Sequence, residues 1–165
     1  MVNGHTGGRI SHAGNVVLFG GSIEPGETAA GAAVRELCEE AGTPHLLARG
    51  GLAAGPRLGT WVTERGIHVE GFMVDLPASF AAEAAADERE VAEVAYLRVA
   101  DVLAAPVQPE FHRVHRSDHR LDADEAWFES PTIRVAHPVS GEIWTLWGLA
   151  GHMVGLWREI QAGTT

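Results

Sequence analysis

The chain has 165 residues, of which 45% are hydrophobic, and its formal net charge is −10 with the histidines neutral. We expect one globular domain over residues 1–165, because single domains average roughly 150 residues. The acidic charge argues against nucleic acid polymers and anionic membranes as partners. An anionic substrate therefore needs a metal ion or a local basic patch.

A single cysteine excludes an intramolecular disulfide. The opening segment MVNGHTGGRI is polar and glycine-rich, without the apolar core of a signal peptide. No segment approaches the roughly 18 consecutive apolar residues of a membrane span. The expectation is a soluble cytoplasmic protein.

The first third of the chain predicts a strand, a loop and a helix in succession. Residues 15–19 form an apolar run typical of a buried strand, and the alanine-rich segment 28–41 predicts a helix. Thr28 is the expected N-cap of this helix. Gly42 is the expected residue just beyond its end, and Pro44 prevents it from continuing.

The rest of the chain predicts mainly strands and a closing helix. Alternating apolar residues indicate strands, and apolar residues three and four apart indicate the helix. Segment 46–66 gives only weak strand signals, and 79–90 is a helical turn or a loop. The predicted elements are strands at 67–76 and 91–99, a short helix at 100–104, a polar loop at 111–125, a β-hairpin within 132–146 and a final helix at 146–161.

Three glutamates crowd the end of the predicted helix at 28–41. Glu36, Glu39 and Glu40 lie within about 100° of one another around the helix axis, so their carboxylates share one face. The negative end of the helix dipole disfavours this charge, and Glu36 and Glu40 repel each other at spacing i,i+4. A cation is therefore expected at this end of the helix.

The chemistry of the side chains restricts which cation this is. Carboxylate oxygens without histidine or cysteine ligands suit Mg²⁺ or Mn²⁺, and the lone Cys38 is not an expected ligand. A solvated acidic helix face is the alternative for most runs of glutamate.

The surrounding residues favour the metal. They fit the pattern G-x5-E-x7-R-E-U-x-E-E-x-G-U, in which U is aliphatic, and Thr43 alone departs from it. A chance match is on the order of 10⁻⁸ per starting position, from average composition. The chain therefore resembles the Nudix hydrolases over residues 21–43. The matching residues are Gly21, Glu27, Arg35, Glu36, Leu37, Glu39, Glu40 and Gly42.

The resemblance implies an α/β Nudix fold, in which a mixed β-sheet is sandwiched between helices. It also implies hydrolysis of a nucleoside diphosphate linked to another moiety, with Mg²⁺ or Mn²⁺ as cofactor. In such a site Arg35 pairs with Glu27 and fixes the loop against the helix. The implied metal ligands are Glu36, Glu39, Glu40 and the backbone carbonyl of Gly20.

The general base has several candidates, because the family uses either a glutamate of the box or a carboxylate from a distant loop. Within the box these are Glu39 and Glu40. Outside it, Glu90 is the first choice and Glu93 the second, and ordinary surface charge is an equal alternative for both.

Three short segments are similar to the coenzyme A pyrophosphatase branch. They are His12–Val16, Glu90–Val94 and Trp147–Ala150, although Leu18-Phe19 stands where that branch has F-P. This resemblance implies cleavage of coenzyme A to phosphopantetheine and adenosine 3′,5′-bisphosphate. The alternatives are ADP-ribose, a dinucleotide or a nucleoside triphosphate as substrate, and a Nudix nucleotide-binding or regulatory module without turnover.

Two further expectations concern partners. A loop rich in His and Arg is a candidate contact for the 3′-phosphate of coenzyme A, with a solvated loop as the alternative; its basic residues are His112, Arg113, His115, Arg116, His119 and Arg120. Only eleven residues precede His12, so the opening strand of the family is expected to be missing or rebuilt. A sheet edge exposed in this way favours a homodimer.

Overall fold

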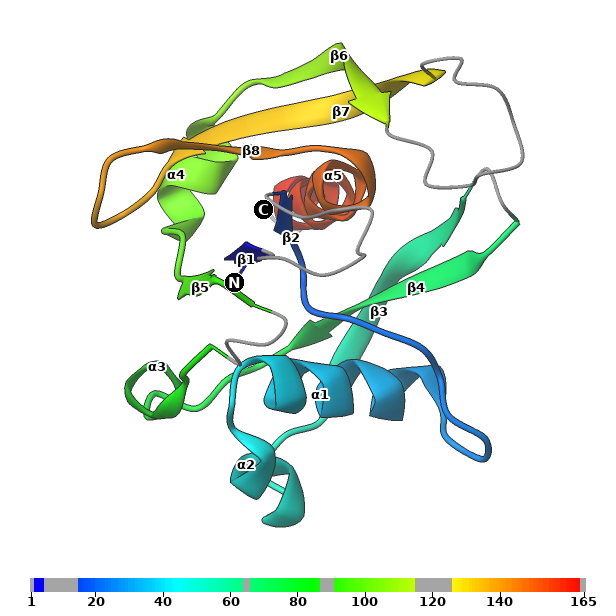
Figure 1. The fold of residues 1–165 in the computed structure, drawn as a ribbon, viewed down its shortest axis with the longest axis vertical. Coiled ribbons are helices and arrows are strands. Elements are labelled where there is room, and N and C mark those ends of the chain that lie inside the picture. Colours follow the sequence, from blue (N-terminus) through cyan, green and yellow to red (C-terminus); the bar gives the residue numbers. More distant parts are fainter. Residues whose placement is uncertain (1, 5–14, 64–65, 87–90, 115–125, 164–165) are drawn as a thin grey trace.

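The computed structural model describes residues 2–4, 15–63, 66–86, 91–114 and 126–163 (Figure 1). These residues form five helices and eight strands. The helices are α1 (Ala29–Glu40), α2 (Pro44–Ala48), α3 (Phe80–Glu83), α4 (Val99–Ala104) and α5 (Gly148–Gly163). The strands are β1 (Val2–Gly4), β2 (Val16–Val17), β3 (Ala54–Val62), β4 (His68–Val74), β5 (Glu93–Ala95), β6 (Val107–Val114), β7 (Ala126–Ala136) and β8 (Ile143–Leu146).

The strands form three sheets with the orders β2-β1-β5, β3-β4 and β6-β7-β8. Strand β3 contacts both α1 and α5, and Figure 1 shows these helices on opposite sides of the β3–β4 hairpin. The α/β class is confirmed. Every strand pair among the described residues is antiparallel.

A short strand, β1, opens the described part of the chain. Strand β1 lies between β2 and β5 and pairs with both, Asn3 standing opposite Val17 on one side and Val94 on the other. Three residues are enough to join two strands that are distant in sequence. The edges of β2 and β5 that face β1 are therefore paired within the chain.

Two clusters of buried side chains hold the helices in place. Leu37 of α1 and Ala41, which follows the helix, pack with Leu46 and Phe80, and a second cluster joins Ile133 of β7, Leu146 of β8 and Ala150 of α5. The apolar face of α1 is thereby fixed, and its charged face is left for the site. No helix in the described ranges is long and apolar enough to span a membrane.

Both predicted ends of α1 are observed. The Thr28 hydroxyl accepts a hydrogen bond from the Gly31 N–H at 3.1 Å, and Gly42 has φ = 64°. The Gly42 N–H donates to the Glu39 carbonyl at 3.0 Å, which satisfies one of the last carbonyls of the helix. Pro44 does more than end α1, because it opens α2 at a position where its missing N–H costs nothing.

The prediction of a polar loop at 111–125 is wrong at its beginning. Residues 111–114 belong to β6, which pairs with β7 from Val107↔Ile133 to Val114↔Ala126. The charged residues that hid this strand contribute to it: Glu110 forms an ion pair with Arg134 of β7, with Nη2–Oε2 at 2.6 Å. Opposite charges on neighbouring strands support pairing where hydrophobic alternation is weak.

Gly42 allows a matched test of how α1 ends. In Gly42→Ala the new Cβ meets the Ala85 carbonyl oxygen and the backbone has a positive φ, whereas Gly26, with φ = 85°, has nothing within 4 Å. We expect Gly26→Ala to cost about 1–2 kcal/mol from the left-handed backbone alone. Gly42→Ala should cost about 1–3 kcal/mol more, from the steric clash. Urea denaturation measures both, and equal losses would contradict the clash.

Candidate metal centre

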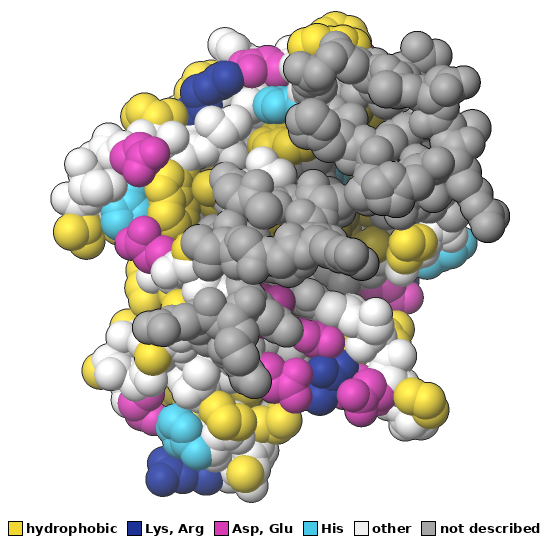
Figure 2. Space-filling view, in the orientation of Figure 1, with side chains coloured by type: hydrophobic (Ala, Val, Ile, Leu, Met, Phe, Trp, Pro, Cys, Tyr) yellow, Lys and Arg dark blue, Asp and Glu magenta, His cyan; other side chains and the backbone are white. Residues whose placement is uncertain are grey.

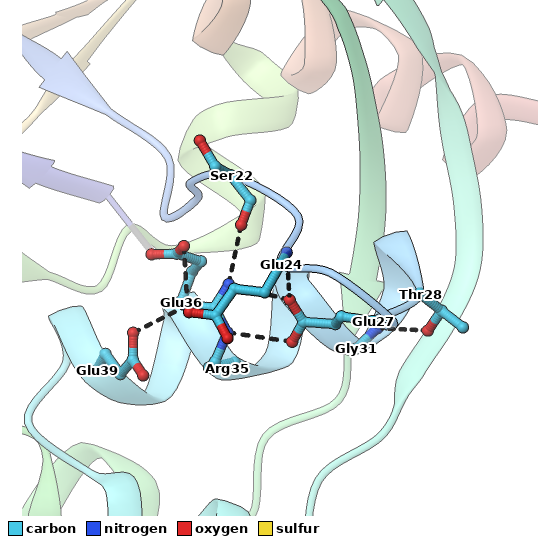
Figure 3. Close-up of polar contacts among 8 residues, drawn as sticks. All are labelled: Ser22, Glu24, Glu27, Thr28, Gly31, Arg35, Glu36 and Glu39. Atoms are coloured by element: carbon cyan, nitrogen blue, oxygen red, sulfur yellow. Dashed lines mark hydrogen bonds and ion pairs between the residues drawn. The ribbon is translucent and has the colours of Figure 1, made fainter.

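The charged face of α1 and the loop before it form a compact acidic cluster. Figure 2 shows acidic side chains gathered around a basic one over α1. The loop enters from β2, turns at 24–27 and leads into the helix (Figure 3). The cluster therefore joins residues of a loop to residues of a helix that is fixed by its own core.

Arg35 lies at the centre of this cluster and uses all five of its N–H donors. Nε and Nη2 donate to the two oxygens of Glu27, each at 3.1 Å, and Nη2 also donates to the Ser22 carbonyl at 2.9 Å. Nη1 donates to Glu36 Oε1 at 2.9 Å and to Glu39 Oε2 at 3.0 Å. A guanidinium has five N–H groups, so this one is saturated. The pKa of Arg35 is raised, chiefly by its hydrogen bonds to Glu27.

Glu27 holds the loop through both its side chain and its backbone. Besides the two bonds from Arg35, its Oε2 accepts from the Glu24 N–H at 3.1 Å, and its own N–H donates to the Glu24 carbonyl at 3.0 Å. The Arg35 guanidinium keeps the pKa of the Glu27 carboxyl below its usual range. The contact that the resemblance implied between Glu27 and Arg35 is present.

The contacts of Arg35 with Glu36 and Glu39 were not predicted. Glu36 and Glu39, both implied as metal ligands, accept hydrogen bonds from the same guanidinium nitrogen (Figure 3). Arg35 thus supplies part of the positive charge expected at this end of the helix. The Arg35–Glu39 pair follows the i,i+4 spacing of helix ion pairs, so the sequence contained the signal for it.

Gly20 and Gly21 have different surroundings. A Cβ on Gly21 would collide with the Glu36 carboxylate, so this carboxylate packs against the backbone of the glycine loop. A Cβ on Gly20 would meet nothing within 4 Å. Glycine is therefore needed at position 21 because the Glu36 carboxylate approaches the backbone closely. The backbone angles do not require it, since φ of Gly21 is not positive.

Glu40 is buried at 6% exposure, whereas the Glu39 side chain is 53% exposed. No group of three or more His, Cys, Asp and Glu side chains among the described residues is arranged to hold a metal. Carboxylates beside a glycine loop are nevertheless the ligands that suit hard divalent cations. The residues fit such an ion by their chemistry, and reorientation of the carboxylates would be needed to surround it.

Of the two candidate bases outside the helix, Glu90 lies outside the described residues, and Glu93 is bound to a histidine. His137 is buried, and its Nδ1 accepts from the Ser140 N–H at 3.0 Å. Its Nε2 therefore carries the proton and donates to Glu93 Oε1 at 3.0 Å. This bond ties β5 to the β7–β8 hairpin, a role that no sequence pattern indicated.

Of the predicted basic cluster, His112 alone has a described side chain. It stacks on Trp147 with ring centroids 4.3 Å apart, and its Nε2 lies 2.7 Å from Thr132 Oγ1. Burial lowers the pKa of His112, which favours the neutral ring and argues against a phosphate contact by this residue. The side chain of Arg113 and residues 115–125 lie outside the described residues.

Two tryptophans lie on strands, Trp61 on β3 and Trp127 on β7. Trp61 already contacts His152, with ring centroids 4.1 Å apart. Trp127 is 61% exposed on β7. Neither has a described contact with the cluster on α1.

A protein-family model matches the greater part of the chain. The family model described as NUDIX domain matches residues 4–117, which cover more than half of the chain and include the whole cluster on α1. No curated protein matches the chain.

The lowered pKa of Glu27 gives a pH prediction. A carboxyl whose pKa is lower in the folded state stabilises the fold above its unfolded pKa of about 4.3, and this contribution disappears as the pH falls through the folded pKa. We expect Glu27→Gln to be less stable than the parent at pH 7, and the difference in stability to shrink as the pH falls through the lowered pKa of Glu27. Urea denaturation at a series of pH values measures this. A difference independent of pH would show that the ion pair does not stabilise the loop.

Proposed function

The chain belongs to the Nudix family of hydrolases acting on nucleoside diphosphate derivatives, and we propose that it is an active, divalent-metal-dependent pyrophosphohydrolase. The observation that carries this proposal is the cluster on α1, where Glu36 and Glu39 converge on one point and Arg35 joins them to the preceding loop. A scaffold of this kind holds carboxylates ready for a cation.

The proposed ligands are Glu36, Glu39, Glu40 and the carbonyl of Gly20, with Mg²⁺ or Mn²⁺ as the ion. A bound divalent ion neutralises charge on the diphosphate and lowers the pKa of an attacking water. The protein residues position these groups: Arg35 fixes the helix against the loop through Glu27 and Ser22. Core packing of Leu37 holds the helix itself.

For the general base, the described contacts favour a glutamate of α1 over Glu93. Glu93 accepts a hydrogen bond from His137 on another part of the fold, which gives it a structural role. Glu39 and Glu40 remain the candidates within α1, and Glu90 remains the candidate outside it. Their side chains differ sharply in exposure, so Glu39 has the easier access to a water molecule.

Coenzyme A is the proposed substrate. Its support is the order of three segments along the chain, His12–Val16, Glu90–Val94 and Trp147–Ala150. The third segment begins at the Trp147 ring, which stacks on His112 immediately before α5. His112 is partly buried, lies next to Thr132 and has a lowered pKa, so the proposal assigns contact with the 3′-phosphate to the other residues of the basic cluster.

Substrate choice is tested by product analysis. We expect the purified protein with Mg²⁺ or Mn²⁺ to convert coenzyme A to phosphopantetheine and adenosine 3′,5′-bisphosphate. ADP-ribose, NADH and nucleoside triphosphates should be cut more slowly. Cleavage of ADP-ribose with coenzyme A untouched would overturn the substrate. Tight binding of one compound without turnover of any would instead support a nucleotide-binding module.

The metal assignment is tested by Glu40→Gln, which keeps the shape of the side chain and removes its charge. We expect turnover to fall by about 10²-fold or more, as when a group acting on the reacting water is lost. Glu159→Gln, an exposed residue of α5, is the matched control and should leave turnover unchanged. Circular dichroism checks that both variants fold. Full activity of Glu40→Gln would exclude this residue from the site.

A further inference from the structure

The two N–H groups of Arg35 Nη1 are bound to the same carboxylates that the proposed function assigns to the metal. Nη1 lies 2.9 Å from Glu36 Oε1 and 3.0 Å from Glu39 Oε2. The remaining three donors bind Glu27 and the Ser22 carbonyl. The guanidinium thus has one edge directed to the loop and one nitrogen directed to the metal ligands (Figure 3).

We propose that Arg35 is the resident counter-ion of the site: it holds Glu36 and Glu39 while no divalent ion is bound, and releases them when one binds. This inference rests on the proposed metal site. Arg35 is then a positioning residue with two states. Its contacts with Glu27 and Ser22 are present in both states, whereas its Nη1 contacts with Glu36 and Glu39 are present only without the ion.

Charge explains why a counter-ion is needed. Glu36 and Glu39 lie near the negative end of α1, where uncompensated carboxylates repel each other and the helix dipole. The Arg35 side chain is 15% exposed and that of Glu36 is 16% exposed, so water screens them only in part. A cation at Nη1 relieves this repulsion when no metal is present.

Charge also explains why the contacts are exchanged. A divalent ion and a guanidinium nitrogen bound to the same carboxylates repel each other at short range. The Glu39 side chain is 53% exposed and has room to turn, whereas Arg35 is retained by its bidentate contact with Glu27. Among the described residues no group of three ligating side chains is arranged to hold a metal, so the proposed exchange includes movement of these carboxylates.

Glu27 holds the Arg35 guanidinium in place during this exchange. Its two oxygens hold Nε and Nη2, so the guanidinium keeps a partner after Nη1 is released. Without Glu27, Arg35 depends more on Glu36 and Glu39 and competes more strongly with the ion. Without Arg35, the competition disappears. The two partners of one ion pair should therefore affect metal affinity in opposite directions.

Isothermal titration with Mn²⁺ tests this directly. We expect Arg35→Gln to bind Mn²⁺ at least about tenfold more tightly than the parent, because the two competing charge-assisted hydrogen bonds of Nη1 are removed, and Glu27→Gln to bind it about tenfold more weakly. Arg98→Gln, just before α4, and Glu159→Gln, on α5, are the matched controls. They remove the same charges as Arg35→Gln and Glu27→Gln. Neither control should change the affinity by more than about twofold, since surface charges are screened.

A second measurement uses the parent protein and does not depend on folding of a variant. Side-chain ¹⁵N spectra of arginine distinguish Nε from Nη. On saturation with Mg²⁺, exchange of the Arg35 Nη1 protons with water should accelerate at least tenfold, while that of Nε–H, bound to Glu27, should stay unchanged. Unchanged Nη1 exchange at saturation would overturn the inference.

The outcomes separate this inference from the proposed function. Weaker Mn²⁺ binding by Arg35→Gln would mean that Arg35 supports the metal ligands instead of competing for them, and would overturn the exchange while leaving the metal site intact. Absence of Mn²⁺ binding by the parent protein would overturn the metal site, and the exchange with it. Opposite shifts in the two variants support both.

Discussion

A single saturated guanidinium organises the charged half of the site. Arg35 binds the loop through Ser22 and Glu27 and binds its own helix through Glu36 and Glu39. Before the glycine loop, Phe19 packs against the apolar cluster that includes Leu37 of α1. The position of the glycine loop relative to α1 therefore depends on this packing and on the ionic hydrogen bonds of Arg35, whose strength is set by how well water is excluded. The apolar cluster behind α1 provides the rigid support that these bonds require.

Local features of the fold were predictable because their causes are local. Thr28 caps α1, Gly42 adopts a positive φ, and the hairpin of β7 and β8 follows from two alternating segments around a turn. Strand β3 gave only weak signals, because it contains glycine and proline and is recognisable mainly through its pairing with β4. The beginning of β6 was hidden for a related reason: Glu110 and His112 are polar, and their partners Arg134 and Thr132 come from β7.

In the site, too, local features could be predicted from the sequence and tertiary contacts could not. The residues of the box and the contact between Glu27 and Arg35 could be predicted from the motif. The bond from Arg35 to Glu36 could not, because adjacent residues of a helix do not face each other, and a long side chain must fold back to join them. The link between Glu93 and His137 joins distant parts of the chain through the tautomer of one ring, which no spacing rule detects. Sequence patterns therefore do not predict the tertiary contacts of polar side chains in this site.

The saturation of Arg35 also determines which basic residue this position accepts. A lysine would preserve the charge but concentrate three donors on one atom, which cannot reach both oxygens of Glu27, the Ser22 carbonyl and two further glutamates. What the loop and the helix share is the flat, forked shape of the guanidinium. The exchange of arginine for lysine, harmless on many protein surfaces, would here change the path of the backbone.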